Sequence, residues 1–336
     1  MTAPQPEMPW PPTKSKWGLD LREVDGMRGP SKQTIELIMC ARLLLAEHHP
    51  MTLRQLHYAI FSAAKIAYAN TKADYIRLSR ATTKARRDYR DRELWGGTNL
   101  LDSETIIPPN WIVDELREAE LVSMWDDVAG YMDTVKTSYR RNNWQDQPNH
   151  VELWSEKATV LGSMRPITRE LGVMLRACRG FGSTGMEGQV GYLFEGIRKP
   201  ITVFYLGDHD PSGHDIQRDI HRRAQQASGR EFRMIRLAIH PEDIQAFHLP
   251  PQTIKPKDSR AESFQRRFGS KAPTVELDAL PVEELRRRVR SAIENLIDSE
   301  TWNRQLAVQE VELKCIAEFA DRVRSLPQRG VSQEPA

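Results

Sequence analysis

At 336 residues, the chain is long enough for two ordinary domains and can bury a core without disulfides. Its hydrophobic share of 39% and charged share of 28% are typical of a globular protein, and no apolar run approaches the roughly 18 residues of a membrane helix. The formal net charge of +2 is too small to identify a polyanionic partner, so the distribution of charge must be considered instead. These values exclude a mini-protein, a membrane-spanning protein and a largely disordered chain.

The ends of the chain and its cysteines bear on location. The proline-rich first twelve residues lack the basic, apolar and small-residue order of a secretory signal, so we expect a cytoplasmic protein. Residues 1–30 and 326–336 are expected to be flexible tails. Three cysteines at distant positions fit neither a disulfide framework nor zinc-ligand spacing, and we interpret them as reduced structural thiols: Cys40, Cys178 and Cys315.

Three helices are predicted in the first half of the chain. Apolar residues recur at helical spacing in Ser31–Glu47, where Ser31 can cap the helix, and in Leu53–Tyr68. Tyr75–Arg90 is a third helical stretch, and apolar residues between 106 and 113 suit short strands. This arrangement predicts a helix-turn-helix or winged-helix module.

Charge is segregated along this half. Residues 52–92 hold ten Lys or Arg against three Asp or Glu, whereas residues 100–133 hold nine acids and one Arg. We interpret the acidic stretch as solvated helix faces. A basic stripe is predicted on the third helix at spacings of three and four, formed by Arg77, Arg80, Lys84 and Arg87. We favour a DNA backbone as its partner, and a solvated helix face is the alternative.

A polar segment at 142–149 marks the expected boundary between a domain at 31–147 and a second one at 148–325. Beyond it, short β-branched and apolar runs alternate with helical stretches, which predicts an α/β domain with a parallel, Rossmann-like sheet. An irregular stretch at 250–273 and a helical tail are expected after the sheet. The predicted strands are Val151–Ser155, Val173–Arg179, Ile201–Leu206 and Phe232–Ile239, and the helices between them are Thr159–Leu171, Glu187–Ile197 and Asp215–Ala227.

Three acidic residues follow two of these strands. Glu156 comes at the end of the first strand, and Asp208 and Asp210 come at the end of the third. Functional groups gather at the carboxyl ends of parallel strands, and alternate residues of an extended segment point the same way. Three converging carboxylates require a cation, and their oxygens suit Mg²⁺ or Mn²⁺. Gly213 and the following helix are expected to direct backbone N–H groups toward the same site. His209 and His214 could donate hydrogen bonds to the metal ligands, but we favour the interpretation that they are ordinary surface residues.

The ordered motifs Ser155-Glu-Lys157 and Asp208-His-Asp210 resemble a Toprim domain, which carries a glutamate after its first strand and Asp-x-Asp after its third. The resemblance is to the topoisomerase VI A subunit, the meiotic double-strand-break transesterase and related phage and actinobacterial Toprim proteins. The turn at 179–183 is similar to a glycine-containing turn of these families. The segment Val275–Pro281 resembles one that follows the Toprim core, so Glu276 and Asp278 are further candidates for the site.

The same resemblance implies a tyrosine nucleophile in the winged-helix module. Arg54-Gln-Leu-His-Tyr58 matches the family segment at Arg54 and Tyr58, whereas Gln55 replaces an acid and His57 replaces a tyrosine. A phenol has a pKa near 10 and needs a base or a cationic partner, which Arg54 or His57 can provide. The alternative is that Tyr58 packs in a helical core.

Three functions remain open from the sequence. In the first, a homodimeric transesterase uses Tyr58 of one subunit with the metal site of the other and forms a 5′-phosphotyrosyl link. In the second, a Toprim nuclease activates water and Tyr58 is structural. In the third, the chain is a non-catalytic DNA-binding module. A topoisomerase would also need an ATPase partner, because the chain has no Walker-type loop.

Overall fold

The computed structural model describes residues 31–95, 106–113, 123–178, 184–252 and 260–325. The chain is an α/β protein whose strands pair in parallel, as the sequence predicts. The predicted tails and the turn at 179–183 lie outside the described residues. In the described part, no helix is both long enough and apolar enough to span a membrane.

Three helices and a short strand pair form the N-terminal region. Ser31 caps the first helix, as expected, because its hydroxyl accepts a hydrogen bond from the backbone N–H of Thr34 at 3.3 Å. The second helix ends earlier than predicted, at Ala63, where Ala64 adopts a left-handed conformation. The elements are α1 (Lys32–His48), β1 (Met51–Thr52), α2 (Leu53–Ala63), α3 (Lys72–Trp95), the 3-10 turn Pro109–Trp111 and β2 (Ile112–Val113), with β1 parallel to β2.

A four-stranded parallel sheet forms the centre of the second half, with strand order β4-β3-β5-β6. Each predicted strand is present, and β5 has the predicted bounds. The strands are β3 (His150–Ser155), β4 (Met174–Ala177), β5 (Ile201–Leu206) and β6 (Arg233–Ala238). Every residue of β5 is buried, which is typical of a central strand covered on both faces.

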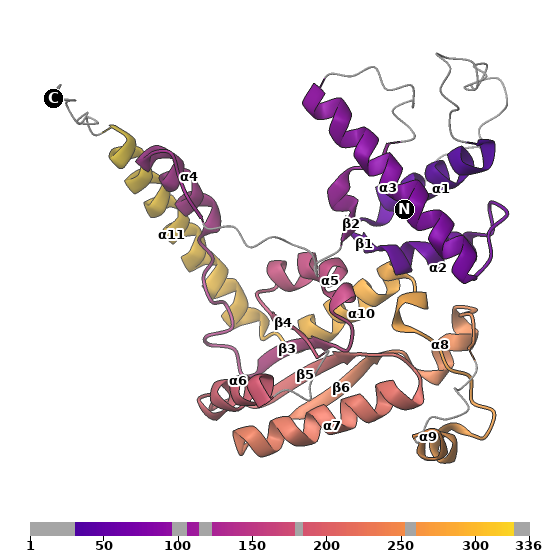
Figure 1. The fold of residues 1–336 in the computed structure, drawn as a ribbon. Helices are drawn as coiled ribbons and strands as arrows, with labels where there is room; N and C mark the ends of the chain where they lie inside the picture. The colour runs from indigo at the N-terminus through magenta and orange to yellow at the C-terminus, as the bar shows by residue number, and fades with distance from the viewer. Residues whose placement is uncertain (1–30, 96–105, 114–122, 179–183, 253–259, 326–336) are drawn as a thin grey trace, which may run out of the picture.

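Helices cover both faces of this sheet. Figure 1 shows α6 and α7 on one face, and α5 and α10 between the other face and the N-terminal helices. The helices are α5 (Ala158–Glu170), α6 (Thr184–Glu195), α7 (Pro211–Ser228), α8 (Pro241–Ala246), α9 (Ala261–Phe268) and α10 (Val282–Glu294). Helix α9 lies in the stretch that was expected to be irregular, and only Phe264 of its side chains is buried.

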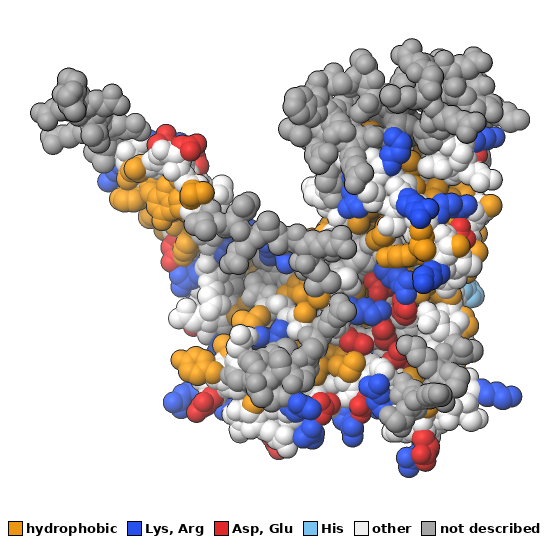
Figure 2. All heavy atoms as spheres, in the orientation of Figure 1, with side chains coloured by type: hydrophobic (Ala, Val, Ile, Leu, Met, Phe, Trp, Pro, Cys, Tyr) orange, Lys and Arg blue, Asp and Glu red, His pale blue; other side chains and the backbone are white. Residues whose placement is uncertain are grey.

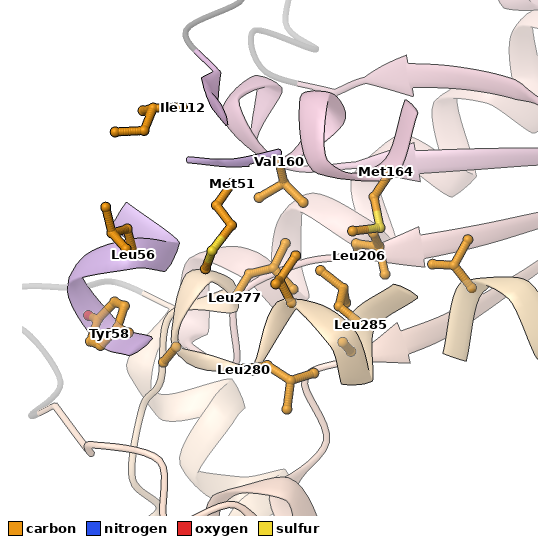
Figure 3. Close-up of a cluster of buried hydrophobic side chains, with 14 of the residues drawn as sticks. Met51, Leu56, Tyr58, Ile112, Val160, Met164, Leu206, Leu277, Leu280 and Leu285 are labelled. Atoms are coloured by element: carbon orange, nitrogen blue, oxygen red, sulfur yellow. The ribbon is translucent and has the colours of Figure 1, made fainter. Parts of the chain in front are cut away.

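One hydrophobic core joins the N-terminal helices to the sheet. Figure 3 shows Met51, Leu56 and Tyr58 facing Leu277, Leu280 and Leu285, with Val160 and Met164 beside them. Their burial removes apolar surface of both regions from water, which stabilises their contact. Helix α2 is therefore held against the segment that precedes α10.

A two-helix arm projects from the sheet region (Figure 1). It consists of α4 (Val128–Ser138) and the 27-residue α11 (Ser299–Ser325), so α4 contacts a helix from the far side of the expected domain boundary. Tyr139 donates a hydrogen bond to Glu312 at 2.5 Å, and Lys136 pairs with Asp321 at 2.6 Å. Figure 2 shows hydrophobic side chains exposed along this arm.

Candidate active site

Glu156 and the Asp208 segment meet at the carboxyl ends of adjacent parallel strands. Glu156 follows β3, and its backbone N–H donates to the carbonyl oxygen of Leu206, the last residue of β5, at 2.9 Å. Its carboxylate Oε2 accepts a hydrogen bond from the backbone N–H of Asp208 at 3.1 Å. Parallel pairing thus brings together two segments that are 52 residues apart, as the strand order in the sequence indicates.

Two glycines make room for the Glu156 carboxylate. A Cβ atom at Gly207 would lie 3.1 Å from Glu156 Oε2, and one at Gly213 would lie 3.0 Å from the same oxygen. At Gly213 the added carbon would also approach the carbonyl oxygen of Asp208 to 2.4 Å, well inside contact distance. Glycine is therefore required at position 213 by close approach of the backbone.

The two aspartates of the Asp-x-Asp motif make different contacts. Asp208 Oδ1 accepts from the backbone N–H of Leu277 at 2.7 Å, whereas Asp210 Oδ1 accepts from the backbone N–H of Gly213 at 2.6 Å and caps α7. The first-turn N–H of Gly213 is thus satisfied within the chain. Among the described residues, no three His, Cys, Asp or Glu side chains converge at metal-ligand spacing. The expected convergence of both aspartates with Glu156 is not present in this arrangement.

The Glu156 and Asp208 carboxyls have raised pKa values. Burial is the main cause for Glu156, and the negative charge of Asp208 adds to it, so that its pKa rises to about 7. Burial also raises the pKa of Asp208, although the Lys157 ammonium opposes the shift. A divalent cation at this position would offset the cost of ionising both groups.

Lys157 lies among carboxylates from three segments. Its Nζ is 2.9 Å from Asp208 Oδ1, 3.0 Å from Asp278 Oδ2 and 3.9 Å from Glu276 Oε2. Burial opposes its charge, but the carboxylates of Asp278 and Asp208 outweigh that effect and raise the pKa of Lys157. A cation is thus held by these carboxylates, and carboxylate oxygens are the ligands that Mg²⁺ and Mn²⁺ prefer. The chemistry of this donor set suits a divalent cation, but in this structure the carboxylates surround Lys157 and do not converge as the predicted ligands would.

Helix α2 brings Arg54 and Tyr58 to the same corner. Arg54 binds Glu276 through two hydrogen bonds of 2.8 and 2.7 Å, and the Tyr58 hydroxyl donates to Glu276 Oε2 at 3.2 Å. Gln252 donates to the same hydroxyl at 3.3 Å. Burial, followed by the negative charge of Glu276, raises the pKa of Tyr58 to about 12. The hydroxyl is therefore protonated at neutral pH and points toward a carboxylate.

His57 does not contact the Tyr58 hydroxyl. Its ring nitrogens lie 2.5 Å from the Tyr68 hydroxyl and 3.0 Å from Asn70 Oδ1, and its side chain is buried. Burial lowers the pKa of His57, so the ring is neutral at neutral pH. Of the two partners proposed for Tyr58 from the sequence, Arg54 is the one near the site, and it acts through Glu276.

Arg236 supports the turn that carries the aspartates. From β6 it donates to the carbonyl oxygens of Gly207 at 2.8 Å, Asp208 at 3.1 Å and Gly213 at 3.1 Å. Its guanidinium also lies 5.3 Å from the centre of the Tyr205 ring. Sequence reasoning missed this residue, although a charged side chain near the end of an apolar strand was a signal that could have identified it.

Of the two histidines beside the motif, His209 is buried rather than at the surface as expected, and His214 is half-buried. His209 is 1% exposed, and its Nδ1 lies 3.0 Å from His214 Nε2. Phe264 and Phe268 of α9 pack against both rings. Burial lowers the pKa of His209 to about 4 and that of His214 to about 3, so both rings are neutral at neutral pH. The contact with α9, which is distant in the sequence, explains why the two rings are less exposed than the sequence predicts.

The expected basic stripe lies on α3, where Arg80 and Lys84 are exposed. Arg77 is tied within the chain, because it pairs with Asp74 at 3.1 Å and donates to the carbonyl oxygen of Ala67 at 3.1 Å. The side chain of Arg87 lies outside the described residues. Figure 2 shows basic side chains over this region and acidic ones where it meets the sheet.

Comparisons with known proteins assign neither a family nor a function to this chain. No protein-family model matches this chain, and no curated protein is significantly similar to it. The geometry of the site and the motifs in the sequence are therefore the basis for inferring a function.

Proposed function

We propose that this chain is a metal-dependent DNA-cleaving protein, with a winged-helix-like N-terminal domain followed by a Toprim-type domain. One observation carries the proposal: Glu156 and Asp208 follow adjacent parallel strands and are joined by a hydrogen bond of 3.1 Å. The glycines beside them leave space around the glutamate that no other residue would leave. A purely structural turn would not require a nearly buried pair of carboxyls with raised pKa values.

In this proposal Glu156, Asp208 and Asp210 hold Mg²⁺ or Mn²⁺. The cation would neutralise charge on a phosphodiester oxygen and on the leaving alkoxide. Asp208 must then release at least part of its contact with Lys157. Arg236 keeps the backbone of the turn in place through the carbonyl oxygens of Gly207, Asp208 and Gly213.

Transesterification through Tyr58 is the first form of the reaction. The Tyr58 oxygen attacks phosphorus, its proton passes to Glu276, and the bond from phosphorus to the 3′ oxygen breaks. The proton then passes from Glu276 through water to the leaving 3′ oxygen, so the products are a 5′-phosphotyrosine and a free 3′ hydroxyl. The 3.2 Å hydrogen bond from Tyr58 to Glu276 supports this route, and Arg54 positions the carboxylate. Because that hydrogen bond lies within one chain, action on the site of a second subunit would require it to break.

Hydrolysis is the second form, and a specific observation favours it. Tyr58 is only 3% exposed, and its pKa is raised to about 12. A buried phenol with a raised pKa is a poor nucleophile, whereas water can approach a cation at the strand ends. In this form, Tyr58 contributes packing and a hydrogen bond to Glu276, but no covalent step.

The partners of the reaction are DNA, a second copy of the chain and an ATPase subunit. Exposed Arg80 and Lys84 on α3 support contact with a phosphate backbone. The homodimer and the ATPase come from the resemblance to topoisomerase VI.

The test uses supercoiled plasmid and Mg²⁺ with wild type, Tyr58→Phe and Asp208→Ala. Protein-linked 5′ ends that disappear in Tyr58→Phe would support transesterification. Cleavage that persists in Tyr58→Phe and disappears in Asp208→Ala would support hydrolysis. If wild type binds the plasmid without cutting it, the chain is a DNA-binding module and the proposed chemistry is wrong.

A further inference from the structure

The Lys157 ammonium lies beside the carboxylates of the proposed metal site. It directly follows Glu156 in the sequence and lies 2.9 Å from Asp208 Oδ1 and 3.0 Å from Asp278 Oδ2. Its side chain is 24% exposed, and that of Asp278 is 2% exposed. Charges in such a place need partners, because few water molecules can screen them.

Among the described residues, the neighbouring cations Arg54 and Arg236 have other partners than Asp208 and Asp278. Arg54 is engaged by both oxygens of Glu276, at 2.8 and 2.7 Å. Arg236 donates to Gln217 and to backbone carbonyl oxygens rather than to these carboxylates. Lys157 is thus the cation that directly contacts both aspartates.

Lys157 and a divalent cation would need the same oxygen. Asp208 Oδ1 already lies 2.9 Å from Lys157 Nζ and 2.7 Å from the backbone nitrogen of Leu277. A divalent cation binds carboxylate oxygens at about 2.0–2.6 Å, so a metal bound by Asp208 would lie within a few ångströms of the Lys157 ammonium. Two positive groups on one oxygen would repel each other.

We propose that Lys157 is a tethered counter-cation, which holds Asp208 and Asp278 in the metal-free protein and is displaced when a divalent cation binds. This inference rests on the proposed metal site. It makes Lys157 a positioning residue that sets metal affinity. It also links the metal to α2, because Asp278 Oδ1 accepts a hydrogen bond of 3.1 Å from Thr52, the N-cap of that helix. Asp278 is thus the residue through which a change at Lys157 reaches the start of the Tyr58 helix.

The first experiment measures Mn²⁺ binding by calorimetry to wild type, Lys157→Met and Lys157→Arg, with Lys199→Met as the control. Lys199 contacts the backbone carbonyl oxygens of Trp144 and Gln145, away from the site. We expect Lys157→Met to bind Mn²⁺ at least tenfold more tightly and to melt at a lower temperature without metal. Lys157→Arg and Lys199→Met should stay within about threefold of wild type.

The results of this binding experiment distinguish the proposed role of Lys157 from the existence of the metal site. If wild type binds Mn²⁺ and Lys157→Met binds it equally or more weakly, the inference is wrong while the metal site stands. If neither protein binds Mn²⁺, the metal site itself is wrong, and the inference fails with it.

A second measurement needs no variant, and it separates displacement from a general effect of charge. Wild type is treated briefly with an amine-acetylating reagent, with and without saturating Mn²⁺, and acetylation at Lys157 and Lys199 is quantified by peptide mass spectrometry. Displacement should increase the Lys157 rate several-fold and leave the Lys199 rate unchanged. A Lys157 rate that is unchanged or lowered by bound Mn²⁺ would overturn the inference.

Discussion

The two acidic segments that meet at the site are built in different ways. The turn from Gly207 to Gly213 is shaped by its own backbone, through glycines, an N-cap and carbonyl groups bound by Arg236. The segment from Glu276 to Asp278 is held by side chains from distant parts of the chain, Arg54, Thr52 and Lys157. The first segment therefore depends on the shape of its backbone and on the one side chain that binds its carbonyl groups, whereas the second depends on separate side-chain contacts.

Arg236→Met should have the largest effect on stability, because it removes the shared donor of the backbone-built turn. Three carbonyl oxygens would lose a partner, which predicts a loss of about 3–5 kcal/mol in the free energy of unfolding. Urea denaturation of wild type and variant measures this loss. Arg218→Met on α7 is the control, because Arg218 is 77% exposed and should change stability by less than about 0.5 kcal/mol. A loss below about 1 kcal/mol for Arg236→Met would show that the turn holds its shape without this residue.

Gly213→Ala should have the second largest effect, a loss of about 2–3 kcal/mol in the free energy of unfolding. The reason is that its Cβ would lie 2.4 Å from the carbonyl oxygen of Asp208. The same shift should displace Glu156 and reduce Mn²⁺ affinity at least tenfold, measured by calorimetry. Gly196→Ala is the matched control, since the nearest atom to its Cβ would be 3.8 Å away. Unchanged Mn²⁺ affinity in Gly213→Ala would disconnect this turn from the metal site.

Glu156 and the segment from Glu276 to Asp278 should also differ in how they make metal binding depend on pH. The pKa of Glu156 is raised to about 7, so a proton must leave when metal binds below that pH. Mn²⁺ affinity should fall about tenfold per pH unit below 7, or about 1.4 kcal/mol, and level off above it. Glu276 has a lowered pKa and should add no dependence in this range.

The raised pKa of Glu156 also determines how the stability of the metal-free protein changes with pH. Because the pKa of Glu156 is raised from 4.5 to about 7, the folded state binds its proton more tightly than the unfolded state does. This group therefore makes the metal-free protein less stable as pH rises from about 4.5 to 7. A Glu156→Gln variant should lose this dependence, and an unchanged profile in that variant would assign the effect to another group.

Arg54→Gln should have the smallest effect, about 1 kcal/mol, because the Arg54 side chain is 40% exposed and solvent screens its pair with Glu276. Glu276→Gln and the double variant complete a cycle measured by thermal or urea unfolding. A coupling energy near zero would mean that the other contacts of the segment from Glu276 to Asp278 hold it without the pair with Arg54.

The backbone-built part of the site could be predicted from the sequence, because its determinants lie close together along the chain. Asp208, Asp210 and Gly213 fall within six residues, directly after a strand whose predicted bounds, Ile201–Leu206, are those of β5. The order of strands then places Glu156 beside them. Local patterning therefore indicated the sheet, its direction and the position of the acidic residues.

The part held by side chains could not be predicted in the same way. Arg54 and Glu276 are 222 residues apart, and Thr52 and Asp278 are 226 apart, so no local pattern connects them. Their contacts depend on how α2 packs against the segment that precedes α10. The burial of His209 has the same origin, because Phe264 of α9 comes from a stretch too short and polar to give a clear helical period.

The arm has a consequence for the order in which the chain folds. Tyr139 and Glu312 are in contact but are 173 residues apart along the chain, and the whole sheet lies between them. Bringing such distant segments together costs chain entropy until the intervening region is compact. Helices α4 and α11 should therefore pair after the sheet has folded and separate before it unfolds. In native-state hydrogen exchange, their amides should exchange through a partial opening, well before those of β5.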